Sequence, residues 1–216
     1  MIRLRERQVA ERRARILRAA ETLIRRTRGT DFPMLRLAAA AEVSPATLYN
    51  LFATKEGLLY TLLSRTLEAF EAKAVDSESR EPMEPVVGAT DNAVQIFLDD
   101  PKFLRPLYRF LLGVTDPAHR PRFIRRAHAY WRAAVDAAVG QHTPVAFSAD
   151  GIAAALMAHF VGVLELWVHG DIDDEAFRAQ AIYGALCLVL PLTQGRQATR
   201  MRERIVSAGS RLVRSS

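Results

Sequence analysis

The sequence contains one cysteine, Cys187, and only three lysines among its 30 basic residues. A single cysteine excludes a disulfide bond within the chain. Because Cys187 lies in the apolar stretch AIYGALCLVLPL, we expect a buried thiol in a reducing compartment rather than a nucleophile. The excess of arginine over lysine is a compositional bias, so only the distribution of the basic residues along the chain is informative.

Uninterrupted apolar segments are also lacking. The longest apolar run, residues 152–168, is interrupted by His159 and Glu165 and is short for a membrane span. The N-terminal residues MIRLRERQVAERRAR are rich in arginine and lack the apolar core of a secretory leader. We therefore expect a cytoplasmic protein with no membrane segment.

The patterns of the common enzyme and metal sites do not occur. The five histidines are scattered, without a His-x-x-x-His pair beside a carboxylate, and the chain has no glycine-rich phosphate loop and no Gly-x-Ser-x-Gly. His159, in an apolar segment, is expected to be a buried, hydrogen-bonded side chain. The sequence therefore predicts neither an enzyme nor a cofactor or metal site.

Positive charge is concentrated in the first third of the chain. Residues 1–65 hold 13 basic and 6 acidic residues, whereas the remaining 151 residues hold 17 basic and 18 acidic ones. Such an asymmetry is expected where one domain binds a polyanion and the other does not.

Apolar residues recur with the period of an α-helix through nearly the whole chain, and no strand-like alternation persists. One such stripe, on a helix that ends near Gly29, consists of Ile16, Leu17, Ala20, Leu23 and Ile24. The segment SESREPMEP is the clearest linker. These patterns predict an all-α protein of about nine to ten helices.

Several pairs place a capping residue before a proline. Asp100-Pro101 and Asp116-Pro117 predict two helix starts, because proline is tolerated at the first helical position. Thr143-Pro144 instead predicts a loop before a helix that Ser148 caps.

The segment VSPATLYNLFATKEGLL, residues 43–59, contains two helix starts about ten residues apart. Ser44 can cap a short helix that begins at Pro45. The apolar side chains Leu48, Leu51 and Phe52 share one face of this helix, and Ala46, Tyr49 and Asn50 share the opposite face. The apolar face needs a neighbouring helix, because two turns do not persist alone.

The outward face of this short helix suits a DNA groove. Small side chains allow close approach, and Asn and Tyr offer hydrogen bonds. Thr54 can cap the following helix, which places Lys55 beside the free N–H groups of its first turn, a favourable position for a phosphate. An ordinary helical hairpin is the alternative interpretation.

Residues 10–70 resemble the DNA-binding domain of the TetR (tetracycline-repressor-like) regulators. The matching stretches are RARILRAAETLI, LRLAAAAEVS, PATLYNLF and TKEGLL. The resemblance implies a three-helix domain over residues 10–70, with a helix-turn-helix at 33–52 and a recognition helix at 45–52. Residues 71–216 would form a larger helical domain that binds a ligand and dimerises.

The same resemblance implies roles for individual residues. Thr47, Tyr49 and Lys55 would contact phosphates, and Pro45, Ala46 and Asn50 would approach base edges. Three positions depart from the family pattern: Glu42 replaces a glycine in the turn, Leu51 replaces a residue that contacts the DNA backbone, and Arg36 replaces an acidic residue and would add a phosphate contact. The predicted DNA-binding residues are Arg36, Ser44, Pro45, Ala46, Thr47, Tyr49, Asn50 and Lys55.

The remainder of the chain carries apolar and aromatic clusters that are either core or the lining of an effector cavity. By resemblance we expect a pocket for a small apolar effector among Phe103, Leu107, Tyr108, Leu111, Trp131, Phe160 and Leu164. Helices at 148–170 and 174–193 are apolar on more than one face, which predicts a homodimer interface that includes Val161, Leu164, Ala185 and Leu188.

These observations together predict a repressor that binds double-stranded DNA at an inverted repeat as a homodimer and is released by its effector. A transcriptional activator of the same family is the nearest alternative. An enzyme, or a membrane-surface protein that uses the arginine-rich N-terminal helix, is a further one. In the membrane-surface alternative the segment 43–59 has no role.

Overall fold

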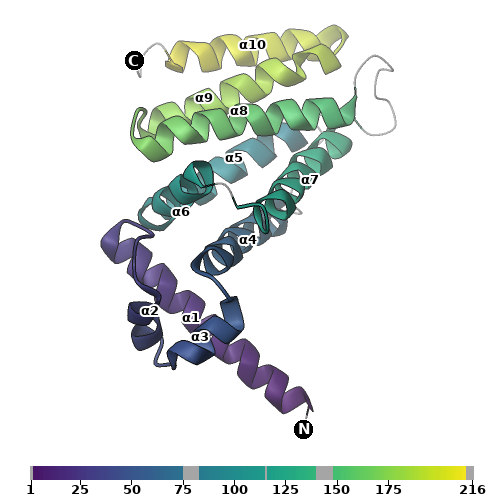
Figure 1. Ribbon diagram of the computed structural model, residues 1–216. Coiled ribbons are helices and arrows are strands. Elements are labelled where there is room, and N and C mark those ends of the chain that lie inside the picture. Colours follow the sequence, from purple (N-terminus) through teal and green to yellow (C-terminus); the bar gives the residue numbers. More distant parts are fainter. Residues whose placement is uncertain (1, 75–82, 115, 140–147, 213–216) are drawn as a thin grey trace. The chain divides into compact units, whose positions relative to one another are not determined.

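The computed structural model describes residues 2–74, 83–114, 116–139 and 148–212. Within these residues the chain forms ten α-helices, one short 3-10 helix and no strand, which confirms the predicted all-α fold (Figure 1). The helices are α1 (Ile2–Thr27), α2 (Met34–Ala40), α3 (Pro45–Phe52), α4 (Lys55–Ala74), α5 (Glu84–Asp99), α6 (Pro101–Gly113), α7 (Arg120–Val139), α8 (Ala149–His169), α9 (Asp174–Val189), η1 (Leu190–Leu192) and α10 (Gly195–Leu212).

The chain folds into two compact units that interleave along the sequence. Unit 1 comprises Met1–Thr66 and Asp100–Phe123, and unit 2 comprises Leu67–Asp99 and Ile124–Ser216. Helices α4 and α7 each contribute residues to both units. The division into a DNA-binding domain at 10–70 and a ligand-binding and dimerisation domain at 71–216 stays a prediction.

Unit 1 is built around α1. Its predicted apolar stripe is buried from Ile16 to Ile24 and packs with α2 and with α6. The capping residues predicted from the sequence are confirmed: Ser44 Oγ accepts the Thr47 N–H at 3.1 Å, and Thr54 Oγ1 accepts the Gly57 N–H at 3.0 Å. Each cap is worth about 1 kcal/mol, and the two together define where α3 and α4 begin.

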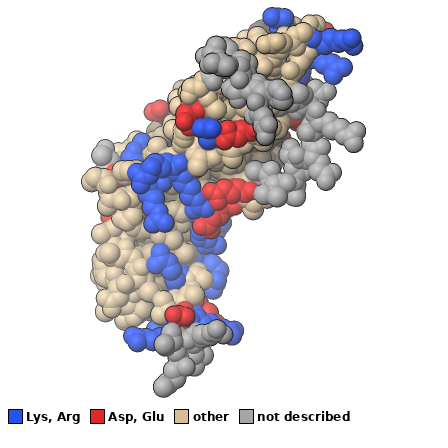
Figure 2. Space-filling model, turned by 90° about the vertical axis from the view of Figure 1, so that its right-hand side faces the viewer, with Lys and Arg blue, Asp and Glu red and all other residues tan. Residues whose placement is uncertain are grey.

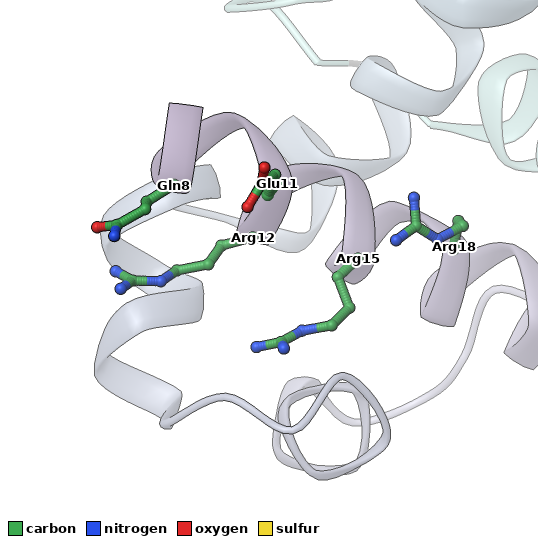
Figure 3. A pocket seen from close by; sticks show the side chains of 5 residues that line it. All are labelled: Gln8, Glu11, Arg12, Arg15 and Arg18. Atoms are coloured by element: carbon green, nitrogen blue, oxygen red, sulfur yellow. The ribbon is translucent and has the colours of Figure 1, made fainter. Parts of the chain in front are cut away.

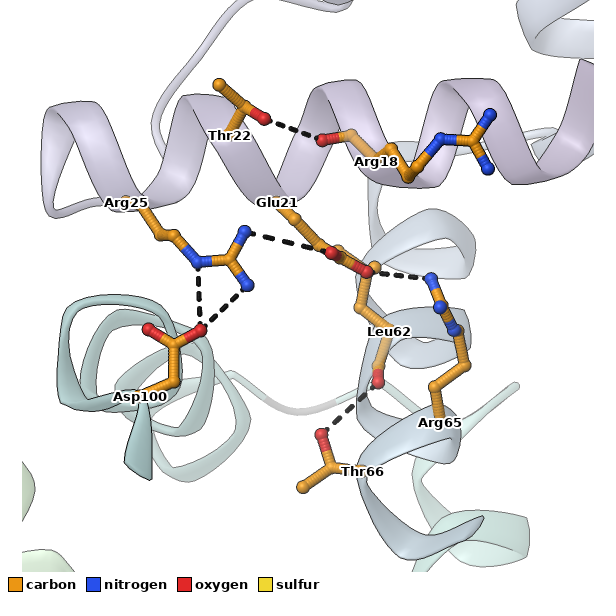
Figure 4. Close-up of polar contacts among 8 residues, drawn as sticks. All are labelled: Arg18, Glu21, Thr22, Arg25, Leu62, Arg65, Thr66 and Asp100. Carbon is orange, nitrogen blue, oxygen red and sulfur yellow. Dashed lines mark hydrogen bonds and ion pairs between the residues drawn. The ribbon is translucent and has the colours of Figure 1, made fainter. Parts of the chain in front are cut away.

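Polar contacts connect α6 and α4 to α1 (Figure 4). Arg25 on α1 pairs with Asp100 at 2.7 Å, and its guanidinium lies 4.9 Å from the centre of the Phe103 ring. Glu21, one turn earlier, pairs with Arg65 on α4 at 2.7 Å. These charges are partly exposed, so each pair contributes at most about 1 kcal/mol, and the buried α6 side chains Leu104 and Leu107 contribute the larger, apolar part.

Two of the predicted helix starts differ in detail. Helix α6 begins at Pro101 as predicted, but the Asp100 side chain makes no capping hydrogen bond, because its carboxylate binds Arg25. Helix α7 begins at Arg120, later than Pro117 suggested, because Asp116 Oδ1 accepts the N–H groups of Ala118 and His119 and closes a turn first. Thr143-Pro144 and most of SESREPMEP lie outside the described residues.

Unit 2 contains a continuous aromatic core. Phe97 on α5 lies 6.0 Å from Phe160, 5.9 Å from Trp167 and 6.1 Å from Phe177, measured between ring centres. The indole N–H of Trp167 donates to Asp174 at 2.7 Å, so its polar atom is satisfied. Helix α9 packs between α8 and α10, which completes a layer of three helices (Figure 1).

The expectation of a buried Cys187 is wrong, because its side chain is exposed. Helix α9 is apolar on more faces than the chain covers, and Cys187 lies on an uncovered one. Helix α8 and the segment Asp174–Leu192 are long and apolar enough to cross a membrane by length and composition, and 39% of an apolar 18-residue stretch in each is buried. Core helices of soluble proteins share that composition.

The contact between α8 and α9 depends on a glycine. The His159 ring, which is half-buried, occupies the space beside Gly184, where an added Cβ would lie 2.1 Å from its Cε1 atom. The ring nitrogen Nε2 lies 3.2 Å from the Gln180 carbonyl oxygen and 3.3 Å from that of Ala181. His159 is thus hydrogen-bonded, as predicted, and any side chain at Gly184 would displace it.

We expect Gly184→Ala to lower the free energy of unfolding by about 1–3 kcal/mol, because the methyl group overpacks the His159 ring. Gly88→Ala on α5 is the matched control: nothing lies within 4 Å of an added Cβ there, so the variant should gain about 0.5–1 kcal/mol of helix propensity. Urea unfolding at fixed protein concentration measures both. Equal stability of Gly184→Ala and wild type would contradict this account of the contact.

Candidate nucleic-acid interface

Helix α3 presents two chemically different faces. Leu48 and Phe52 are buried and Leu51 is half-buried, so this face is covered by the rest of unit 1. The side chain of Tyr49 is 47% exposed, and the other outward residues are exposed or, for Thr47, half-buried. The outward residues are Ser44, Pro45, Ala46, Thr47, Tyr49 and Asn50.

Arg13 on α1 fixes the C-terminal end of α3. Its Nη1 donates to the Leu51 carbonyl at 2.9 Å, its Nη2 donates to Thr61 Oγ1 at 3.3 Å, and its guanidinium lies 4.4 Å from the centre of the Phe52 ring. The sequence patterns did not single out this residue. Its position could have indicated it: Arg13 lies one turn before Leu17 on the buried side of α1, where a charged side chain needs polar partners.

Lys55 occupies the first position of α4, directly after the Thr54 cap. Its ammonium lies 5.1 Å from the centre of the buried Phe32 ring, and the residue is half-buried. The cation–π contact is worth about 0.5–1 kcal/mol and orients the side chain. Lys55 and the free N–H groups of the first turn therefore lie together.

A residue with positive φ lies on each side of α3. Glu42, in the turn before α3, has φ +51°, a conformation that favours the glycine of the family pattern, and Ala53 after the helix has φ +56°. The carbonyl of Glu42 accepts a hydrogen bond from Arg15 at 3.2 Å. Each strained residue costs about 1–2 kcal/mol, which neighbouring contacts must offset.

Helix α3 has no basic side chain, but other parts of unit 1 do. Arg36 on α2 is exposed. Figure 2 shows that Lys and Arg side chains cover more of one face of the molecule than Asp and Glu do.

Among the described residues no group of three or more His, Cys, Asp or Glu side chains is arranged to bind a metal ion.

A second polar cluster lies against the first turn of α4. His119 Nδ1 is 3.0 Å from Asp116 Oδ2, and its ring stacks on Tyr60 with 5.6 Å between ring centres. Its Nε2 would lie 3.4 Å from a Cβ at Gly57, two residues after Lys55. The turn between α6 and α7 therefore packs on the end of α4 that carries Lys55.

The environment of Asp116 favours its charged form. Burial alone would raise the pKa of this carboxyl, but hydrogen bonds from the His119 side chain and from the N–H groups of His119 and Ala118 together lower the pKa below its ordinary value. The resulting stabilisation is present above the ordinary carboxyl pKa and is lost as the pH falls through the lowered value.

The residues predicted to line an effector pocket are all buried, in two groups. The α6 group, in unit 1, consists of Phe103, Leu107, Tyr108 and Leu111. The unit 2 group consists of Trp131, Phe160 and Leu164, in which the Trp131 and Phe160 ring centres are 5.3 Å apart. Burial raises the pKa of Tyr108 far above its ordinary value, as an apolar environment requires.

The residues predicted for the dimer interface divide by exposure. Leu164 and Ala185 are 2% and 1% exposed and belong to the core of their own chain. Val161 and Leu188 are half-buried. Only the latter two present surface to another molecule.

Residues 16–61 match the sequence model of the bacterial regulatory proteins of the tetR family. The chain carries a TetR-family DNA-binding domain. The match contains the whole α1 stripe, α2, α3 and the start of α4, and it confirms the resemblance seen in the sequence. TetR-family proteins are transcriptional regulators rather than enzymes. No curated protein matches the chain.

Solved TetR-family structures share the fold well beyond the matched segment. A TetR regulator from Rhodococcus sp. RHA1 has a TM-score of 0.68 at 19% identity, over 88% of this chain and 100% of its own. TylP from Streptomyces fradiae has a TM-score of 0.66 at 18% identity, over 94% and 98%. RolR, in complex with resorcinol, has a TM-score of 0.62 at 18% identity, over 91% and 94%. At these identities the likeness establishes the fold.

Proposed function

We propose that the protein is a cytoplasmic repressor that binds an inverted-repeat operator as a homodimer and is released by a small apolar molecule. The observation that carries the proposal is the exposed face of α3. It lies between a capped N-terminus at Ser44 and the Lys55 side chain, and it contains no carboxylate.

The exposed groups of α3 suit the two parts of a DNA duplex. Asn50 can make a bidentate contact with adenine, and the small Pro45 and Ala46 allow the helix to approach base edges. Phosphate contacts, which set position rather than sequence, are assigned to Ser44, Thr47, Tyr49, Lys55 and Arg36. A helix held at both ends can present these groups in one orientation.

Lys55→Ala should weaken binding to all DNA sequences and reduce the slope of log affinity against log salt by about one, because the variant lacks the ammonium that binds a phosphate. The duplex is chosen by selection from a random pool, in which we expect an enriched inverted repeat. Lys102→Ala, which removes an exposed lysine on α6, is the matched control and should change neither quantity. Binding by Lys55→Ala with wild-type affinity and slope would show that Lys55 has been misassigned.

Dimerisation through α8 and α9 is supported by their uncovered apolar surface. Leu166 on α8 is 40% exposed, and Val161 and Leu188 are half-buried. Gly162 is exposed near the middle of α8, and nothing lies within 4 Å of an added Cβ. Two recognition helices can read successive major grooves only when about 34–36 Å separates them, so DNA binding as proposed requires the dimer.

Light scattering at micromolar concentration should give twice the chain mass of 24.1 kDa. Gly162→Arg should shift the mass towards the monomer, because a charged side chain would be buried at the interface, whereas in the single chain an added Cβ at this exposed position has nothing within 4 Å. Ala137→Arg, at an exposed position on α7, adds the same charge and should remain dimeric. A monomer mass for the wild type would contradict the dimer.

Release by an effector is supported by the two buried groups of predicted lining residues. The α6 group packs in the same compact unit as α3, so a ligand that contacts it can alter the DNA-binding unit directly. The complex of RolR with resorcinol supports a small-molecule site in this fold. The effect on DNA affinity is limited by the differential affinity of the ligand for the two states.

Thermodynamic linkage makes the coupling reciprocal. The selected operator duplex should weaken binding of the effector by the same factor by which the effector weakens binding of the duplex. Apolar compounds, including resorcinol, are first screened for the rise in the unfolding temperature of the protein. The compound with the largest rise is the ligand used in calorimetry. Ligand affinity unchanged by saturating duplex would exclude release by this route.

A further inference from the structure

The N-terminal half of α1 carries a basic groove of its own. The groove has a volume of about 350 Å³ and is lined by Gln8, Glu11, Arg12, Arg15 and Arg18 (Figure 3). The side chains come from successive turns of one helix, and those of Gln8, Arg12 and Arg15 extend to the same side of it. Residues 12–18 span about 9 Å along the helix axis.

The charge of the groove is largely uncompensated. Arg12, Arg15 and Arg18 are exposed, and within the described part of the chain none of them forms an ion pair. Glu11 is the single carboxylate in the lining, and its Oε1 already accepts from Arg7 Nε at 3.0 Å. Three arginines that face one groove repel each other, so an anion between them would be stabilised.

The groove adjoins the turn that precedes α3. Arg15 Nη2 donates to the carbonyl of Glu42 at 3.2 Å, and Ser44, the cap of α3, follows two residues later. The N-terminal residues of a recognition helix are those that contact base edges. A duplex held by α3 would therefore have its backbone close to this groove.

The position of the groove separates it from the family pattern. The matched segment begins at residue 16, so Gln8, Arg12 and Arg15 precede it. Helix α1 begins at Ile2 and extends well beyond the part that packs in the core. The buried stripe does not account for an arginine at each of these positions.

We infer that the α1 groove binds the phosphodiester backbone of DNA beside the bases that α3 contacts. This inference rests on the proposed DNA-binding function. Guanidinium groups bind phosphate oxygens with paired, charge-assisted hydrogen bonds, and the Gln8 amide supplies a further donor. The groove adds phosphate contacts but no base recognition, so it raises affinity for every sequence alike.

The test compares Arg12→Gln/Arg18→Gln with wild type on a fluorescently labelled duplex of random sequence that is longer than one half-site. Arg15 is left intact because it supports the turn at Glu42. Because the variant lacks two phosphate-binding guanidinium groups, the slope of log affinity against log salt should fall by about two, and between about 50 and 200 mM salt the affinity of the wild type should decrease by roughly tenfold more than that of the variant. Arg125→Gln/Arg202→Gln removes the same charge from exposed positions in unit 2 and should keep the wild-type slope.

Each outcome has one meaning. Equal slopes for the α1 variant and wild type, with Lys55→Ala still weakened, would overturn the groove and leave the proposed function standing. No duplex binding by the wild type would remove both. An equal decrease in both double variants would reduce the effect to net charge and overturn the groove. Co-sedimentation with vesicles containing anionic lipid that is abolished only in the α1 variant, while its DNA slope stays at the wild-type value, would assign the groove to membranes instead.

Discussion

The packing of α1 is the constraint on which the rest of unit 1 depends. A helix as short as α3 does not persist alone, because the few hydrogen bonds of two turns do not offset the cost of nucleation. Its Leu48 and Phe52 side chains are buried within unit 1, where α3 packs with α2 and α2 packs with α1, and Arg13 on α1 binds the Leu51 carbonyl in its last turn. Without α1, neither the position nor the existence of α3 follows from its own sequence.

The same helix brings α6 into the DNA-binding unit. Arg25 contacts both the carboxylate of Asp100 and the ring of Phe103, at the start of α6. Along the chain, α6 follows α5 directly, and α4 and α7 continue from unit 1 into unit 2. Three covalent connections thus join the two units, and each ends in unit 1 close to α1 or to the Lys55 end of α4.

Local sequence signals predicted the elements that local chemistry determines. Ser44 and Thr54 cap α3 and α4 because a hydroxyl three residues before a free N–H is sufficient for the contact, whatever the rest of the chain does. The outward face of α3 followed from helical spacing in the same way. The positive φ of Glu42 was not predicted, because a glutamate at a glycine position suggested a different turn.

Contacts between distant segments could not be predicted in this way. Asp100 was expected to cap α6, but Arg25, 75 residues earlier, competes for its carboxylate, and only the packing of α1 on α6 brings the two together. Arg13 and the groove around Arg15 depend likewise on which helices become neighbours. For the pocket residues, sequence indicated burial correctly, but it did not indicate that they divide between α6 and unit 2.

The exposure of Cys187 has a practical consequence. Because the sequence has no other cysteine, a thiol-reactive spin label or fluorophore attaches at one defined position on α9 of the unmodified protein. In an assembly of two identical chains the two labels would be related by symmetry, so a single measured distance would report how the two α9 helices lie with respect to each other. Repeating that measurement with DNA bound would report any change in the arrangement of the two α9 helices, and no residue would have to be substituted.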